Sequence, residues 1–223
     1  MARATTPAKG VSTGSGQARA SQARASQPRA WQRMLSGRRL DLLDPSPFDV
    51  EIDDIAHGLA RVARWNGQTT GPYPFSVAQH SLLVEALAQH LRAELPAQTA
   101  LIILLHDAAE YVIGDIISPF KAVLGDAYKG VEARILAAVM MRFGLPPEIK
   151  GPIKTLSKQA DSIAAYYEAT HLAGFSVEDA ERYFGSYDNV PASILKMLEP
   201  WTTEKAEKAF KARFHALSET SFS

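Results

Sequence analysis

A chain of 223 residues can form one domain with a substantial core and is too short to form two large ones. Its net charge is zero but unevenly distributed: residues 1–40 hold eight Arg and Lys and no acidic residue, whereas residues 41–223 hold sixteen Arg and Lys against twenty-four Asp and Glu. An acidic body argues against nucleic acid as a partner, because nucleic acid requires a basic surface. The absence of cysteine excludes disulfides and thiolate-bound zinc, so any metal must be held by histidine and carboxylate side chains.

The distribution of apolar residues argues against a membrane partner. No apolar run approaches the roughly 18 residues that suggest a transmembrane helix. The N-terminus also lacks the apolar segment of a secretory signal, so the sequence favours a cytoplasmic protein.

Residues 1–30 are rich in Ala, Ser, Gln, Gly and Arg and almost devoid of large apolar side chains. This composition predicts a disordered basic tail, with the folded domain at residues 31–223. A tail rich in Arg and Ser and free of acids also resembles an organelle transit peptide, but it has no clear apolar face, so simple disorder is favoured.

The predicted elements after the tail are mostly helical. Residues 39–52 alternate around Pro45 and Pro47, which predicts a small hairpin or loop. Asp53 is a good N-cap for a helix over residues 54–65. No sustained strand pattern follows, so the sequence predicts an all-α fold of five to seven helices after a short N-terminal extended segment. The other expected helices span residues 75–91, 97–111, 126–144, 152–173 and 203–218.

His106 and Asp107 follow the apolar run at residues 101–105, which marks a buried helix. Burying a carboxylate without a partner costs several kcal/mol, and a metal ion that binds both side chains removes that cost. Successive helical residues point about 100° apart, so both can reach one ion only near the helix end. The alternative is structural, with Asp107 capping a neighbouring element and His106 donating to a backbone carbonyl.

Two other residues become informative beside this pair. His80 shares a helix face with Val84 and Leu87, which predicts that it is buried; taken alone, it is better interpreted as a hydrogen-bonded core histidine. Asp161 is flanked by alanines that let its helix approach another closely; taken alone, it is better interpreted as a surface carboxylate facing Lys158 or Lys154.

The order and spacing of His80, the His106-Asp107 pair and Asp161 resemble the HD phosphohydrolase superfamily. Closer motifs resemble its bacterial 5'-deoxynucleotidase branch: Arg-Trp at 64–65, Gln-His-Ser at 79–81, "HDAAEYVIGDIISPFK" from His106, and "KQADSIAAYYEA" around Asp161. The resemblance covers residues 61–170, about half of the chain. Two features depart from that branch: Gln79 replaces a glutamate, and residues 37–61 are more similar to phage and proteobacterial HD hydrolases of deoxynucleoside triphosphates.

The resemblance implies an all-α HD-domain bundle with one divalent metal bound between helices by His80, His106, Asp107 and Asp161. Two imidazoles and two carboxylates suit Co, Mn, Zn or Fe(II) better than Ca or Mg. The resemblance also implies a homodimer, for which the amphipathic C-terminal helix is the candidate interface.

Two acids are candidates for catalysis. Glu110 lies four residues after His106 and three after Asp107, on the same side of a helix, where it could orient or deprotonate the attacking water. Asp115 follows the flexible Gly114, and the resemblance implies that it positions the water or protonates the leaving group. The alternative is that both acids are solvated at a helix end.

Several residues are candidates for binding substrate. Arg64 matches the arginine of the Arg-Trp motif and can bind phosphate through two N–H groups. Trp65 either forms a wall for the sugar or base or packs in the core. Lys121 could add a point charge and Ser118 a hydrogen bond.

His57, Arg61 and Arg64 would share one helix face at spacings of four and seven. Three such groups in a row could follow a polyphosphate, and the alternative is a solvated surface.

The expected function is divalent-metal-dependent phosphohydrolysis of a small-molecule nucleotide. The first expectation is a 5'-deoxynucleotidase that releases phosphate from deoxynucleoside monophosphates. A deoxynucleoside triphosphate hydrolase of the dATP type is the second, and a non-catalytic nucleotide-sensing HD protein is the alternative from another class.

Overall fold

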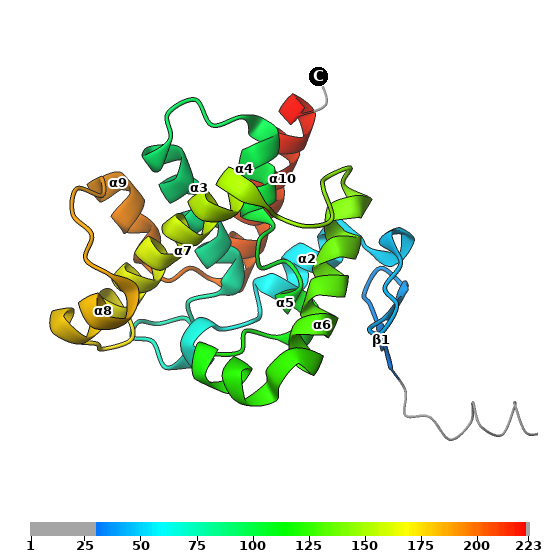
Figure 1. Ribbon diagram of the computed structural model, residues 1–223, viewed down its shortest axis with the longest axis horizontal. Helices are drawn as coiled ribbons and strands as arrows, with labels where there is room; N and C mark the ends of the chain where they lie inside the picture. Colours follow the sequence, from blue (N-terminus) through cyan, green and yellow to red (C-terminus); the bar gives the residue numbers. More distant parts are fainter. Residues whose placement is uncertain (1–29, 222–223) are drawn as a thin grey trace, which may run out of the picture. The chain divides into compact units, whose positions relative to one another are not determined.

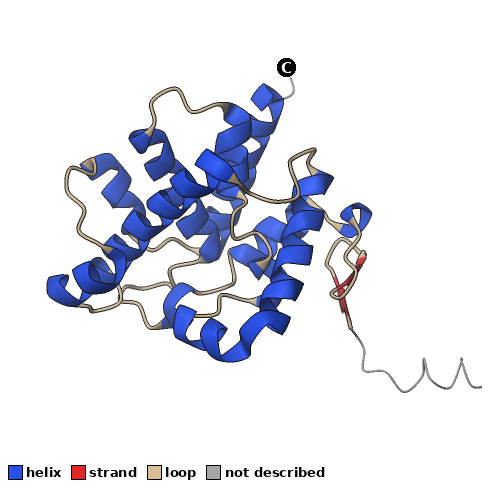
Figure 2. Cartoon of the chain, in the orientation of Figure 1, coloured by secondary structure: helices blue, strands red, loops and turns tan. Residues whose placement is uncertain are grey.

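The computed structural model describes residues 30–221, in which helices supply nearly all of the regular structure (Figure 2). The predicted all-α class with a short N-terminal hairpin is confirmed. The prediction of a disordered tail at residues 1–30 lies almost entirely outside the described residues. The strands are β1 (Trp31–Arg33) and β2 (Arg39–Asp41), and the α-helices are α2 (Ile52–Leu59), α3 (Val77–Leu91), α4 (Ala97–Leu104), α5 (Glu110–Ile113), α6 (Ser118–Arg142), α7 (Gly151–His171), α8 (Val177–Phe184), α9 (Ala192–Leu195) and α10 (Thr203–Ser221).

The hairpin lies earlier in the chain than predicted. Strands β1 and β2 pair antiparallel, with Trp31 opposite Asp41, and the connecting turn contains Gly37 at a φ of 90°. The expected hairpin around the two prolines is instead a single 3₁₀ turn, Pro47–Asp49, which Ser46 caps. Proline at the first position of a helical turn is favourable because its fixed φ suits the turn and its missing N–H is not needed there.

Helix α3 lies at the centre of the domain and packs against α7, α4 and α10 (Figure 1). The apolar run at residues 101–105 is fully or almost fully buried, as its composition predicts. The apolar face of α10 is also buried in this core, through Ala206, Phe210, Phe214 and Leu217. The predicted homodimer stays a prediction, and a contact through α10 would have to use another face of this helix, because its apolar face is covered within the chain.

Two glycines shape α6. The helix begins at Ser118, eight residues before the predicted start, and is interrupted at Gly125, where φ is 72°. It ends as predicted before Gly144, whose φ is 69°; the N–H groups of Gly144 and Leu145 bond back to the carbonyls of Met141 and Met140. Within residues 30–221, no helix has both the length and the hydropathy needed to cross a bilayer.

We expect Gly58→Ala to lower the free energy of unfolding by about 1–3 kcal/mol. A Cβ at Gly58 in α2 would lie 2.8 Å from the Cβ and the carbonyl oxygen of Tyr111 in α5. This clash exceeds the roughly 1 kcal/mol that alanine gains in helix propensity. Urea denaturation measures the difference.

The matched control is Gly130→Ala in α6, where the nearest atom to an added Cβ is the end of the flexible Arg134 side chain, at 3.4 Å. This variant should be as stable as the wild type or more so. A Gly58→Ala protein that behaved in the same way would contradict close contact between α2 and α5.

Candidate metal centre

Three separate segments bring the predicted metal ligands together. His80 comes from α3, His106 and Asp107 from the turn after α4, and Asp161 from α7. One ligand atom each of His80, His106 and Asp161 lies within 4.8 Å of the other two, so these three side chains can hold a metal ion. Asp107 adjoins them, with its Oδ2 at 3.2 Å from Nε2 of His106 and 3.5 Å from Nε2 of His80.

The two histidines have the protonation pattern that a metal requires. Nδ1 of His106 lies 2.9 Å from the carbonyl oxygen of Ile103, and Nδ1 of His80 lies 2.5 Å from a carboxylate oxygen of Glu168. Both partners are acceptors, so each Nδ1 carries a proton and each Nε2 is left with a lone pair in the neutral ring. Among the described residues, both Nε2 atoms are buried and have no hydrogen-bond partner.

The charges around His80 also favour a bound cation. Although burial and Arg64 oppose its protonation, Glu168, Asp107 and Asp161 raise the pKa of His80 well above its ordinary value. Burial would raise the pKa of Asp107, but His106 and His80 bring it well below its ordinary value. A nitrogen lone pair and a carboxylate that face each other repel, unless a positive charge lies between them. A metal ion supplies that charge, and the residues therefore fit the predicted group.

The turn after α4 explains how His106 and Asp107 reach one site. The predicted helix over residues 97–111 is wrong in its second half, since α4 ends at Leu104 and α5 begins at Glu110. Between them the bonds span three residues, as from the N–H of His106 to the carbonyl of Ile103 and from the N–H of Glu110 to that of Asp107. This tighter winding changes the angle between successive side chains and places the pair at a helix end.

Glu110 and Asp115 both lie at this centre. Glu110 is buried, its Oε1 is 3.4 Å from Nζ of Lys121, and its Oε2 has no hydrogen-bond partner. Burial, together with the charges of Asp107 and Asp115, raises the pKa of Glu110 to about 9. Asp115 follows Gly114, whose φ is 77°, and its Oδ2 is 3.5 Å from Arg64. The alternative that both acids are solvated is therefore wrong for Glu110.

Arg64 and Trp65 reach the centre from a short irregular segment. Arg64 lies between Asp115, at 3.5 Å, and Glu168, at 3.3 Å. The indole Nε1 of Trp65 donates to the same glutamate at 2.9 Å, and the ring packs against Phe175 and Phe184. Both Trp65 and its neighbour Asn66 have positive φ values, of 56° and 51°, which are unusual for residues other than glycine.

The remaining substrate candidates have different surroundings. Nζ of Lys121 lies between Glu110, at 3.4 Å, and Glu132, at 3.0 Å. Ser118 begins α6, and its side chain lies outside the described part of the structure.

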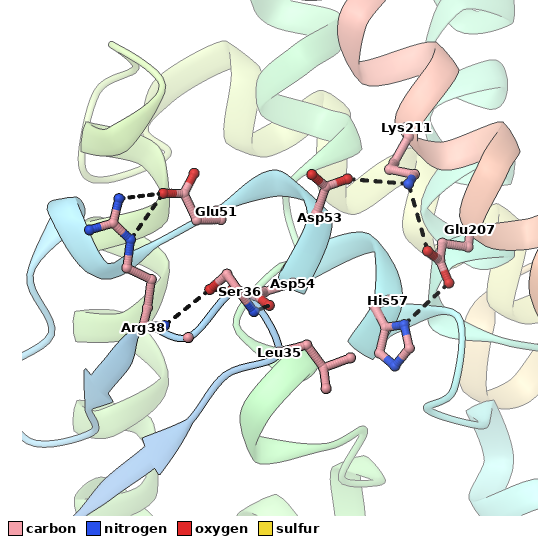
Figure 3. A pocket seen from close by; sticks show the side chains of 10 residues that line it. Leu35, Ser36, Arg38, Glu51, Asp53, Asp54, His57, Glu207 and Lys211 are labelled. Carbon is pink, nitrogen blue, oxygen red and sulfur yellow. Dashed lines mark hydrogen bonds and ion pairs between the residues drawn. The ribbon is translucent and has the colours of Figure 1, made fainter.

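The predicted row of His57, Arg61 and Arg64 is wrong. The N-cap of α2 is Glu51 rather than the predicted Asp53, and the helix ends at Leu59 rather than at Trp65. Arg61 and Arg64 therefore lie outside the helix, and the three residues do not share a helix face. His57 and Arg61 both contact Glu207 of α10, at 3.4 and 2.8 Å. His57 and Glu207 line a cavity of about 690 Å³, and none of the metal ligands lines it (Figure 3).

Sequence reasoning missed two buried polar residues. Glu168 in α7 is fully buried and contacts His80, Arg64 and Trp65. It follows Asp161 by seven residues, which places both on one helix face, and this spacing was the signal available.

Gln79 is the second residue, and its position explains one departure from the resembled branch. Its amide nitrogen donates to the carbonyls of Met197 and Glu199, at 2.6 and 2.7 Å, and its oxygen accepts from the N–H of Trp201 at 3.0 Å. An ionised carboxylate could not donate to these two carbonyls, which accounts for glutamine rather than glutamate here.

Comparisons with known proteins give relatives without described activities. No protein-family model matches the chain. It is 55% identical over 188 residues to the uncharacterized protein RCAP_rcc00048 of Rhodobacter capsulatus. The matched region covers 84% of this chain and 95% of that protein. It is 33% identical over 171 residues to the uncharacterized protein YfdR of Escherichia coli. Here the matched region covers 77% of this chain and 86% of YfdR.

We expect Gln79→Glu to lower the free energy of unfolding by roughly 1–3 kcal/mol, because a buried carboxylate would face two carbonyl oxygens and lose both donors. Urea denaturation measures this loss. The control is Gln32→Glu, since Gln32 also donates to a carbonyl but is exposed, and its change should stay within about 0.5 kcal/mol. Equal stability of the two variants would contradict the role assigned to Gln79.

We expect Glu110→Gln to stabilise the metal-free protein, and to do so more strongly at pH 8 than at pH 5.5. With a folded-state pKa of about 9, above the ordinary value of 4.5, folded protein holds a proton that unfolded chain releases, so wild-type stability falls as the pH rises between those values. Glutamine removes this loss, which amounts to at most ~1.4 kcal/mol per pH unit.

Denaturant unfolding with a chelator at both pH values tests this prediction. The control is Glu148→Gln, because Glu148 is exposed and Lys150 lowers its pKa, so this variant gains nothing as the pH rises. A Glu110→Gln effect that is the same at both pH values would refute the raised pKa.

Proposed function

The chain belongs to one family with RCAP_rcc00048 and YfdR, and from its metal-binding cluster we propose that it is a divalent-metal-dependent phosphohydrolase that acts on nucleotides. The observation that carries the proposal is the convergence of His80, His106 and Asp161, with Asp107 beside them and two unpartnered Nε2 atoms among them. This is the ligand set of the HD superfamily, which the sequence resembles.

The donor set indicates the class of metal. Two imidazoles and two carboxylates favour Co, Mn, Zn or Fe(II), since imidazole prefers borderline metals to Ca and Mg. When bound, such a cation screens the charge of a phosphate and makes a neighbouring water more acidic.

Glu110 is the proposed general base. It is buried beside Asp107, and its Oε2 is free to accept the proton of an attacking water. It must be ionised to do so. In the metal-free protein its pKa is about 9 even with Lys121 nearby, so a bound cation beside Asp107 would have to lower the pKa of Glu110 for this role. Asp115 contacts Arg64 at 3.5 Å, and there it could position the water or protonate the leaving oxygen.

The cations near the centre favour a monophosphate as substrate. Arg64 and Lys121 lie among its acids, and two cations suit the charge of one terminal phosphate. The row of cations that would have favoured a triphosphate is not formed, because His57 and Arg61 bind Glu207. Trp65 has an aromatic ring suited to a sugar or base. We therefore favour a 5'-deoxynucleotidase over a deoxynucleoside triphosphate hydrolase.

A phosphate-release assay tests the proposal. Deoxynucleoside mono-, di- and triphosphates are incubated with the protein and Co²⁺ or Mn²⁺, and we expect phosphate from the monophosphates and none after chelation. Asp107→Ala should lower this activity by more than the roughly 10- to 100-fold that changes around a metal's outer shell cost.

The control for lost charge is Asp53→Ala, because Asp53 is exposed and pairs only with Lys211, at 3.2 Å, among the described contacts. It should retain full activity. Turnover of triphosphates with inert monophosphates would replace the nucleotidase by a triphosphohydrolase. Nucleotide binding without any turnover would identify a non-catalytic sensor, and full activity of Asp107→Ala would exclude the metal mechanism.

A further inference from the structure

A single buried carboxylate, that of Glu168, connects the metal ligands to the candidate substrate contacts. Its Oε1 lies 2.5 Å from Nδ1 of His80, and its Oε2 lies 2.9 Å from Nε1 of Trp65 and 3.3 Å from Nε of Arg64. The side chain is completely buried, so these three side chains replace its hydration.

We infer that Glu168 is a positioning residue that couples metal binding at His80 to substrate binding at Arg64 and Trp65. This inference rests on the proposed function. Glu168 itself touches neither the reacting atoms nor the metal, and it acts through the groups that it orients.

The contact with His80 fixes one metal ligand. By accepting from Nδ1–H, Glu168 holds the ring in the tautomer whose Nε2 lone pair points at Asp161 and Asp107. Rotation of the ring would break this bond inside a buried site. The carboxylate therefore sets both the direction and the basicity of the ligand.

The contacts with Arg64 and Trp65 fix the two side chains that are proposed to bind the substrate. These residues follow α2 in a segment with no regular helix, and Trp65 holds a left-handed backbone conformation that bulky residues avoid. Glu168 gives both side chains a common acceptor, and Phe175 and Phe184 support the indole ring. The conformation that presents Arg64 beside Asp115 thus depends on the same carboxylate that orients His80.

A role in stability alone does not account for a charge at this position. Burying a carboxylate with an arginine is costly, and apolar side chains of similar volume often stabilise a core better. Three N–H donors converge on two oxygens, so only a carboxylate can accept on both sides. A glutamine must turn its NH₂ group either toward His80 or toward Arg64 and Trp65, and one side then loses its acceptor.

The decisive experiment measures metal affinity and kinetics in Glu168→Gln. Titration calorimetry with Co²⁺ alone should show affinity 10- to 100-fold below wild type, and the visible absorption of bound Co²⁺ should change because His80 is no longer held. The KM for a deoxynucleoside monophosphate, measured at saturating metal, should rise as well. Glu168→Asp keeps two acceptor oxygens and should recover part of both losses.

The matched control is Glu85→Gln. Glu85 is another buried carboxylate of the core. Arg213, a residue of α10 that does not contact the metal ligands, binds Glu85 through two N–H groups at 2.7 and 3.0 Å. This variant should lose stability and keep wild-type Co²⁺ affinity and KM.

The outcomes separate this inference from the proposed function. A wild-type protein that binds no Co²⁺ and hydrolyses no nucleotide refutes the proposed function, and the coupling with it. A wild type that does both, with Glu168→Gln equal to it in Co²⁺ affinity and KM, overturns the coupling alone. If Glu168→Gln does not fold, Glu168→Asp decides: wild-type Co²⁺ affinity, spectrum and KM in that variant would also overturn it.

Discussion

Compensation of charge around His80 is the constraint on which the rest of the structure depends. Two imidazole nitrogens and two carboxylates face one another, and because His80 is fully buried while Asp161 is 44% exposed, solvent screens their repulsion only in part. Positive charge among these groups, from protons or from a metal ion, lowers this repulsion. The packing of α3 against α4 and α7 holds the four groups in place against their mutual repulsion.

Half of the candidate ligands, and the charged side chains Asp115 and Arg64 near them, come from irregular backbone. His106 and Asp107 lie in a tight turn, Asp115 follows a glycine with positive φ, and Arg64 precedes two residues in left-handed conformations. The regular helices α3 and α7 contribute the other two candidate ligands, His80 and Asp161, together with the buried Glu168. Rigid helices fix positions, whereas the irregular segments aim side chains in directions that a continuous helix would not allow.

The sequence was sufficient to predict the class of fold and the ligand candidates. Helices α3, α4, α7 and α10 follow from apolar periodicity, and the cost of a histidine and an aspartate after an apolar run pointed to the centre. The end of α2 could not be predicted, because residues 60–65 contain no Gly or Pro. Contacts distant in sequence impose the turn there, since the N–H of Arg64 bonds to the carbonyl of Phe75 and Ala63 bridges to Ser76.

Other features depended on knowing which side chains meet. Glu168 looks like an ordinary helical acid until Asp161 is known to face His80. Gln79 appeared only as a departure from a motif, whereas its amide joins α3 to residues 197–201. In both cases the partners lie more than eighty residues away in the chain, beyond the reach of local patterns.

The bonds made by Gln79 have a consequence for biosynthesis. Helix α3, which carries His80, is hydrogen-bonded through Gln79 to the backbone of Met197, Glu199 and Trp201. Helix α10 follows these residues and packs against α4, α2 and α3. During vectorial translation, residues 77–110 leave the ribosome long before those partners exist. The packing around α3 is therefore completed only after the C-terminal helix has emerged.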